Sequence, residues 1–322
     1  MNILITSAGS RVSLIRAFQK ELKKVDPQAK VICADANPML SSGCHAADTY
    51  FKVPLLNNPS YIELLIELCK KNNIGLIIPT IDTELTILAK NKELLEKNNI
   101  KPVIASIDFI KKCRDKRVIH NFFESKNIKV AKEYDKKNYQ LPLFIKPLDG
   151  SRSIDTFVIK TKDDLTDYHF KNDKLMFLEY LDHKKYEEFT CDLYYGKDNL
   201  LKCVVPRKRI KVRDGEVNKG VTMNNELVPY LKERLNHIDG AVGCLTAQFF
   251  KSKKDSEIYG IEINPRFGGG FPLSYLAGAN FPKWIIDEYF LNKKIDENFD
   301  CWEDNLLMLR YDDEILIHGY KS

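Results

Sequence analysis

Residues 2–106 alternate short apolar runs with amphipathic stretches, and this alternation constrains the fold more than any other feature of the chain. Strand-like runs are expected at 2–6, 31–35, 75–80 and 101–106, and helical periodicity separates them at 12–24, 59–72 and 83–99. Alternating strands and helices with short links predict a doubly wound parallel sheet. Ligands of such sheets gather at the carboxyl ends of the strands. Those ends carry Ser7, Ala8, Gly9, Asp35 and Thr80.

The pattern changes near residues 108–115, which is the best candidate for a domain boundary. A helical stretch at 109–127 leads into a strand-rich, antiparallel α+β region. Strands are expected at 144–147, 156–160, 175–181, 187–195, 200–212, 216–223, 244–250 and 257–265, with a last strand near 314–319. Further helices are expected at 228–243 and 281–291.

Composition excludes several classes of protein. The 322 residues carry 50 basic and 45 acidic side chains, and the resulting charge of +5 is too balanced for a dedicated nucleic-acid binder. The first residues do not have the pattern of a signal peptide, and no apolar run approaches the length of a membrane span. The eight cysteines form no CxxC pair, which favours a reduced, cytoplasmic protein without a membrane partner.

The segment GIEINPRFGGG at 260–270 is the strongest candidate for a metal site. Glu262 and Asn264 alternate along a strand, so both side chains leave the same face. Gln248, in the preceding apolar strand, could meet them if the two strands pair. A few protein oxygens with positions left for phosphates suit Mg²⁺. Arg266 follows on the same face and could bind phosphate oxygens.

Lys116 and Lys146 are candidates for phosphate contacts. Lys146 precedes a polar loop, DGSRS, whose Gly150, Ser151 and Ser153 could cover a nucleotide phosphate through backbone N–H groups. Taken singly, each lysine is more often an ordinary surface residue. The acids Glu179 and Glu187–Glu188, beside apolar strands, are equally unremarkable when taken alone.

The segment 204–217 alternates so that Arg207, Arg209, Lys211 and Arg213 share one strand face. Like charges in a row repel one another, so they need either an anion or abundant water. An anion site and a solvated hairpin face with Asp214-Gly215 as its turn are equally compatible with the pattern.

In this order, these pieces resemble the ATP-grasp superfamily, and most of all its carbamoyl-phosphate-synthase-like single-chain ligases. The resemblance covers almost the whole chain, and its most specific part is Gln248 followed by Glu262-x-Asn264-x-Arg266. It implies a pre-ATP-grasp α/β domain at 1–112. It also implies an ATP-grasp fold of two α+β subdomains, the small one at 113–178 and the large one at 179–322.

The resemblance also assigns roles to individual residues. ATP phosphates would be bound by Lys116, by Lys146 and by the loop that includes Ser151 and Ser153. Adenine would be recognised by Glu179, Tyr180 and Leu181, and the ribose by Glu188 rather than Glu187. Mg²⁺ (or Mn²⁺) would be held by Gln248, Glu262 and Asn264. The catalytic residues would be Lys146 and Arg266, with the arginine steadying the transferred phosphoryl group. Apart from the resemblance, Arg207 and Arg209 are assigned to an anionic substrate from the basic strand face, and Gly9 from its place at the carboxyl end of a strand.

The activity that this implies is ligation. The γ-phosphoryl group of ATP moves to a small-molecule carboxylate, and an amine or a similar nucleophile attacks the resulting acyl phosphate. A phosphotransferase and a non-catalytic ATP-binding module are the alternatives. A dehydrogenase is less favoured because SAGSR lacks the GxGxxG spacing of a dinucleotide site. In the resembling family a homodimer is common.

Overall fold

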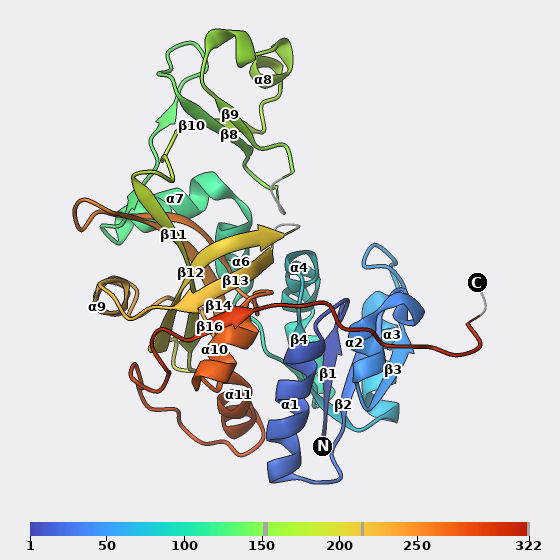
Figure 1. Cartoon of the computed structure of the whole chain (residues 1–322). Coiled ribbons are helices and arrows are strands. Elements are labelled where there is room, and N and C mark those ends of the chain that lie inside the picture. The colour runs from blue at the N-terminus through green and yellow to red at the C-terminus, as the bar shows by residue number, and fades with distance from the viewer. Residues whose placement is uncertain (151–153, 214–215, 321–322) are drawn as a thin grey trace.

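The structure is a computed structural model that describes residues 1–150, 154–213 and 216–320. Its strands form sheets of five, four and seven strands. Figure 1 shows the five-stranded sheet with its helices, the large sheet beside it, and the small sheet at the far end of the large one. The expected combination of a parallel α/β unit and two α+β parts is confirmed.

The N-terminal sheet has the order β3-β2-β1-β4-β5, and all its pairs are parallel. Its strands are β1 (Asn2–Thr6), β2 (Val31–Asp35), β3 (Thr49–Lys52), β4 (Ile74–Pro79) and β5 (Lys101–Pro102). Its helices are α1 (Val12–Val25), α2 (Ser42–Ala46), α3 (Tyr61–Lys71), α4 (Asp82–Lys90) and α5 (Lys92–Lys97), with a 3₁₀ turn at Pro38–Leu40. From β1 the chain adds β2 and β3 on one side of the sheet, and then β4 and β5 on the other side. Ligands of such sheets are expected at the carboxyl ends of the two strands where the order switches, which here are β1 and β4.

Two details of this unit differ from the prediction. Strand β3 was not expected because its TYFK sequence is short and only partly buried. The long helix expected at 83–99 is interrupted at Asn91, which separates α4 from α5. The helix expected at 59–72 is α3, Tyr61–Lys71, and its buried face includes Tyr61, Leu65 and Cys69, whereas Leu64 is 42% exposed.

The small sheet has the order β7-β10-β8-β9. Its strands are β7 (Glu133–Tyr134), β8 (Leu143–Pro147), β9 (Phe157–Ile159) and β10 (Leu175–Glu179). The 3₁₀ turn Lys162–Asp164 and α8 (Asp167–Lys171) connect β9 to β10. A separate apolar cluster fills it, made of Leu143, Ile145, Ile159, Leu175 and Phe177. Ser151 and Ser153, which we expect to cover the phosphates, lie outside the described residues.

The large sheet has the order β16-β13-β12-β11-β14-β15-β6. Its strands are β6 (Lys129–Val130), β11 (Tyr186–Tyr195), β12 (Leu201–Arg213), β13 (Glu216–Thr222), β14 (Gly243–Ser252), β15 (Ile258–Asn264) and β16 (Leu307–Leu309). Its helices are α9 (Leu227–Arg234), α10 (Phe271–Ala277) and α11 (Phe281–Tyr289). The last strand is therefore at 307–309 and not near 314–319, because β16 is the segment that reaches the free edge of β13.

The helical stretch at 109–127 is two helices, α6 (Ile107–Arg114) and α7 (Lys116–Ser125). Asp115 is extended and accepts hydrogen bonds from the N–H groups of Arg117 and Val118, so it begins α7. Phe123 of α7 packs edge-on against Phe249, with ring centroids 5.7 Å apart. A Cβ at Gly260 would lie 2.5 Å from the Phe123 ring, so only glycine allows this approach.

This packing bears on the domain boundaries. Helix α7 and β6 belong with the large sheet, since β6 pairs with β15. The expected small subdomain at 113–178 thus contributes its first residues to the large one, and the boundaries themselves stay predictions. Among the described residues, no helix combines the length and apolarity needed to traverse a bilayer.

Candidate functional site

The three residues expected to hold a metal lie on two paired strands. In the antiparallel pair β14–β15, Gln248 lies opposite Glu262, and Thr246 lies opposite Asn264. The Asn264 Nδ2 donates a hydrogen bond of 2.9 Å to Glu262 Oε1. All three side chains are half-buried, so they form a polar row that solutes can reach. The structure therefore brings Gln248, Glu262 and Asn264 together as the alternation suggested.

Both lysines approach Glu262 from other elements. Lys146 of β8 is 6% exposed, and Lys116, the first residue of α7, is 9% exposed. The Lys116 Nζ donates to the carbonyl of Gly150 at 2.6 Å. Burial lowers the pKa of Lys116 and brings the pKa of Lys146 down to about 8, while the Glu262 carboxylate raises both. Their charges therefore act on one another across the space between the small sheet and β15.

His120 is a member of this cluster that the sequence did not indicate. It lies four residues after Lys116 on α7, which places both side chains on one helix face. Burial lowers its pKa to about 4, and the charge of Lys146 acts in the same direction. The imidazole is therefore neutral at pH 7, and the positive charge of the cluster comes from the two lysines.

The charges of this cluster fit a magnesium nucleotide. Two buried ammonium groups face one carboxylate, and among the described residues no acid forms an ion pair with Lys146. The described part of the chain also holds no group of three His, Cys, Asp or Glu side chains suited to a metal. A cation at Glu262 would accordingly depend on amide oxygens and on phosphate oxygens of a ligand, as Mg²⁺ bound with nucleotides does.

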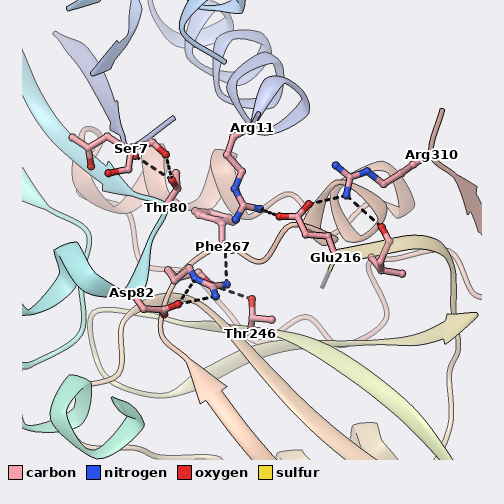
Figure 2. A network of polar contacts seen from close by, with 11 residues as sticks. Ser7, Arg11, Thr80, Asp82, Glu216, Thr246, Phe267 and Arg310 are labelled. Atoms are coloured by element: carbon pink, nitrogen blue, oxygen red, sulfur yellow. Dashed lines mark hydrogen bonds and ion pairs between the residues drawn. The ribbon is translucent and has the colours of Figure 1, made fainter. Parts of the chain in front are cut away.

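Arg266 links the large sheet to the N-terminal sheet through Asp82, which is labelled in Figure 2. Its Nη2 and Nε donate to Asp82 Oδ2 at 2.9 and 3.2 Å, and its carbonyl accepts a 3.0 Å bond from Thr246 Oγ1. Asp82 is the first residue of α4 and follows the carboxyl end of β4. Sequence reasoning missed Asp82, although its place two residues after Thr80 put it at the expected ligand edge.

Arg207, the first of the four basic residues that alternate along β12, is not open to solvent. It is 1% exposed, and its Nε and Nη2 donate to the fully buried Asp192 at 2.8 and 3.0 Å. Ser274 Oγ also donates to Asp192, at 2.6 Å. Strand alternation indicates which face a side chain takes but not how deeply it is covered. The guanidinium is committed to a buried ion pair, so its position argues against direct contact with a substrate.

The other members of the row differ from Arg207. Arg209 is partly exposed and forms an ion pair with Glu188, the acid assigned to the ribose. Arg213 pairs with Asp312 near the end of the described chain. The turn expected at Asp214-Gly215 lies outside the described residues. The row is thus divided among separate acids and does not form one continuous anion site.

The residues assigned to adenine lie where the small sheet joins the large one. Glu179 ends β10, Tyr180 is half-buried and Leu181 is 6% exposed. The Glu179 N–H donates to the carbonyl of Lys132 at 2.8 Å, which fixes this end of the strand. Recognition of adenine by Glu179, Tyr180 and Leu181 stays a prediction.

Gly9, assigned to the substrate, is exposed and has a φ of +49°. Its N–H donates to Asp35 Oδ2 at 3.1 Å, and its carbonyl accepts from Ser41 Oγ at 2.8 Å. The backbone of Gly9 therefore shapes the edge of the N-terminal sheet, and a contact with substrate remains a prediction.

Comparison with protein families gives two matches. Residues 3–104 match the model of the PylC-like N-terminal domain, and residues 171–304 match a model described as ATP-grasp in the biosynthetic pathway with Ter operon. Neither segment includes Lys116 or Lys146. No curated protein sequence matches the chain.

Solved structures share the fold at low sequence identity. The pyruvate carboxylase of Rhizobium etli has a TM-score of 0.68 at 14% identity. The match covers 95% of the present chain but only 30% of the pyruvate carboxylase chain. The biotin carboxylase domain of Hydrogenobacter thermophilus 2-oxoglutarate carboxylase, solved with MgADP and bicarbonate, has a TM-score of 0.72 at 13% identity, over 95% of this chain and 73% of that one. The L-amino acid ligase of Bacillus licheniformis has a TM-score of 0.65 at 16% identity, over 89% and 73% respectively. At these identities the likeness establishes the fold.

Proposed function

We propose that this chain, which belongs to the ATP-grasp superfamily, is an ATP- and Mg²⁺-dependent ligase that activates a carboxylate as an acyl phosphate. An amine or similar nucleophile then displaces the phosphate, and ADP and phosphate are released. The observation that carries the proposal is the convergence of two buried lysines on Glu262, which shares a strand with Asn264, two residues before Arg266.

The proposed chemistry is electrostatic. The ammonium groups of Lys116 and Lys146 bind phosphate oxygens and neutralise charge as the γ-phosphoryl group moves. Glu262, Asn264 and Gln248 would hold Mg²⁺, or Mn²⁺ in its place, and the cation would supply further neutralisation of the phosphate charge. Their strand pairing fixes these ligands before the nucleotide arrives.

Arg266 orients the acid in this proposal. Its side chain is 17% exposed, and its guanidinium retains N–H groups besides those that donate to Asp82. It lies two residues beyond Asn264, so it can bind the carboxylate, and then the acyl phosphate, on the side of the metal ligands that faces the N-terminal sheet. The ion pair with Asp82 is what holds it there.

The nucleoside part of ATP is assigned to the junction of the two sheets. Glu179, Tyr180 and Leu181 bind adenine, and Glu188 accepts from the ribose hydroxyls. Arg209 pairs with Glu188 and thereby orients that carboxylate. We accordingly place Arg209 on the nucleotide side, rather than at the carboxylate as the charge row suggested.

The nucleophile is proposed to be an amine. Support comes from the structural likeness to a protein named L-amino acid ligase. The biotin carboxylase domain of similar fold carries MgADP and bicarbonate, which supports a nucleotide beside a small carboxylate-type acid.

A phosphate-release screen tests the proposal. The purified protein with MgATP is offered a matrix of carboxylic acids and amines, and free phosphate and ADP are measured together. We expect equal amounts of both, and only when an effective acid and an effective amine are present. ADP without free phosphate would indicate a phosphotransferase. MgATP binding with no turnover across the matrix would indicate a non-catalytic module.

The affinity for ATP should depend on pH through Lys146. Its pKa of about 8 means that the ammonium is largely charged at pH 7 and loses its charge as the pH rises above 8. A bound nucleotide favours the charged form, so binding weakens only above the pKa of the free protein. We expect KM for ATP to be flat from pH 6.5 to 7.5 and to rise above about pH 8.

The matched variant for this experiment is Lys146→Arg, because arginine stays charged throughout that range. Its KM for ATP should be independent of pH up to about pH 10. The same rise in the arginine variant as in the wild type would show that another group titrates.

Replacement of Glu262 by alanine should raise the Mg²⁺ concentration needed for half-maximal turnover and lower kcat by about 10²-fold or more. Removal of the only carboxylate among the three metal ligands weakens cation binding. Glu257→Ala, at an exposed acid next to the same strand, is the control and should behave as the wild type. An unchanged Mg²⁺ requirement in Glu262→Ala would refute the metal assignment.

A further inference from the structure

Three arginines from distant parts of the sequence lie near one another beside the site, and Figure 2 shows two of them, Arg11 and Arg310, on either side of Glu216. Arg11 immediately precedes α1, Arg266 follows β15, and Arg310 follows β16. The charges of Arg266 and Arg310 both lower the pKa of Arg11. Arg310 also lies against Glu216, the acid that Arg11 contacts. Burial is the largest cause of the lowered pKa of Arg11. The side chains of Arg310 and Glu216 are more exposed, at 35% and 38%.

Two acids accompany the three arginines. Asp82 is bound to Arg266, whereas Glu216 at the start of β13 lies between the other two. Arg11 Nη1 is 3.5 Å from Glu216 Oε1, and Arg310 Nη1 is 2.9 Å from Oε2. One carboxylate thus occupies two guanidinium groups. The five side chains together carry one positive charge in excess, which favours a further anion.

Glu216 is accessible enough for another carboxylate to replace it as the partner of Arg11 and Arg310. Its side chain is 38% exposed, in contrast to the fully buried partner of Arg207. Gly269 lies directly against its carboxyl group, since a Cβ there would be 2.4 Å from the Glu216 Cδ. The segment that follows Arg266 therefore connects the proposed place of the reacting carboxylate, at Arg266, with Glu216 and its partners Arg11 and Arg310. Phe267, 3% exposed, is buried against Phe18 and Phe271.

We propose that Arg11 and Arg310 bind a second, unreacting carboxylate of the acid substrate, with Glu216 occupying their guanidinium groups until that carboxylate displaces it. The substrate is then a dicarboxylic acid, one carboxylate at Arg266 for activation and the other at the Arg11–Arg310 pair. This inference rests on the proposed function for the identity of the reacting carboxylate. Planar, bidentate recognition is the reason that arginine suits such a group.

The experiment compares acids of equal carbon number with one or two carboxylates, such as succinate with butyrate and glutamate with glutamine. The variants are Arg310→Gln, Arg310→Lys and Arg11→Gln. Arg16→Gln, an exposed arginine on the same helix as Arg11, is the control. Two quantities are measured, namely phosphate release with MgATP and an amine, and the rise in melting temperature caused by the acid in the presence of MgADP.

In the wild type and in Arg16→Gln, we expect the diacid to have a KM at least about 10-fold below that of its matched monoacid, and to be the one that raises the melting temperature. Arg310→Gln and Arg11→Gln should raise the KM for the diacid by about 10-fold or more and leave that for the monoacid unchanged. Arg310→Lys should restore part of the preference.

The two measurements separate the possible failures. Turnover of both kinds of acid with equal KM, or an equal loss for both in Arg310→Gln, overturns the inference and leaves the ligase proposal intact. Stabilisation by the diacid that depends on Arg310, without phosphate release from any acid, overturns the ligase and retains the anion subsite. If no diacid raises the melting temperature and none is turned over, both the inference and the ligase proposal are overturned.

Discussion

Replacement of Lys146 by alanine is expected to reduce kcat/KM for MgATP by about 10²–10³-fold, the usual effect of removing one donor from a transferred group. Lys146 is 6% exposed and has no ion-pair partner among the described residues, so its charge is available to the nucleotide. The fold should persist, because removal of this ammonium relieves the cost of its burial. Steady-state phosphate release with the best acid and amine is the measurement.

Lys137→Ala provides the control for this variant, since Lys137 is an exposed lysine of the same small subdomain. It should retain the wild-type rate. The circular-dichroism spectrum and melting temperature of Lys146→Ala are recorded alongside, to separate loss of chemistry from loss of fold. A folded Lys146→Ala protein with wild-type turnover would remove this residue from the phosphate site.

The second large effect concerns stability, where Arg207→Ala should lower the free energy of unfolding by about 3–5 kcal/mol. The substitution leaves the carboxylate of Asp192 buried without its bidentate partner. Ser274 Oγ at 2.6 Å and Thr246 Oγ1 at 3.4 Å remain beside it but carry no charge. Urea unfolding followed by circular dichroism measures the difference between variant and wild type.

The double variant Asp192→Asn/Arg207→Met tests the cause of this loss, because it removes both charges and keeps similar volumes. It should recover part of the stability lost in Arg207→Ala, as replaced buried ion pairs often do. Arg213→Ala, which removes an exposed member of the same row, should cost little. A stable Arg207→Ala protein with a raised KM for the acid alone would restore the substrate role that the sequence suggested.

Patterns within short stretches of the sequence predicted most of the secondary structure and the shared strand faces correctly. The alternation of apolar runs indicated the parallel sheet, because a strand of period 2 and a helix of period 3.6 are recognisable within about ten residues. The same reasoning put Glu262 and Asn264 on one face, and only the pairing with Gln248 required the structure. The lysines were identified through resemblance to a family, since a lone lysine in a strand carries no signal of its own.

Contacts between distant segments could not be predicted. Asp82, Arg11, Glu216 and Arg310 are brought together by the docking of the N-terminal sheet against the large one, which no local periodicity records. Arg207 shows the complementary failure. Its alternation with Arg209 was correct, but the buried Asp192 on the neighbouring strand became its partner only through the register of β11 and β12.

Transfer of oxygen from the acid to phosphate is the most direct test of the acyl phosphate. The effective acid is labelled with ¹⁸O in its carboxylate, turned over with MgATP and an effective amine, and the released phosphate is analysed by mass spectrometry. Attack of the carboxylate on the γ-phosphorus, followed by displacement by the amine, predicts one ¹⁸O atom in each phosphate released. Phosphate that carries no label would contradict carboxylate activation by phosphoryl transfer at this site.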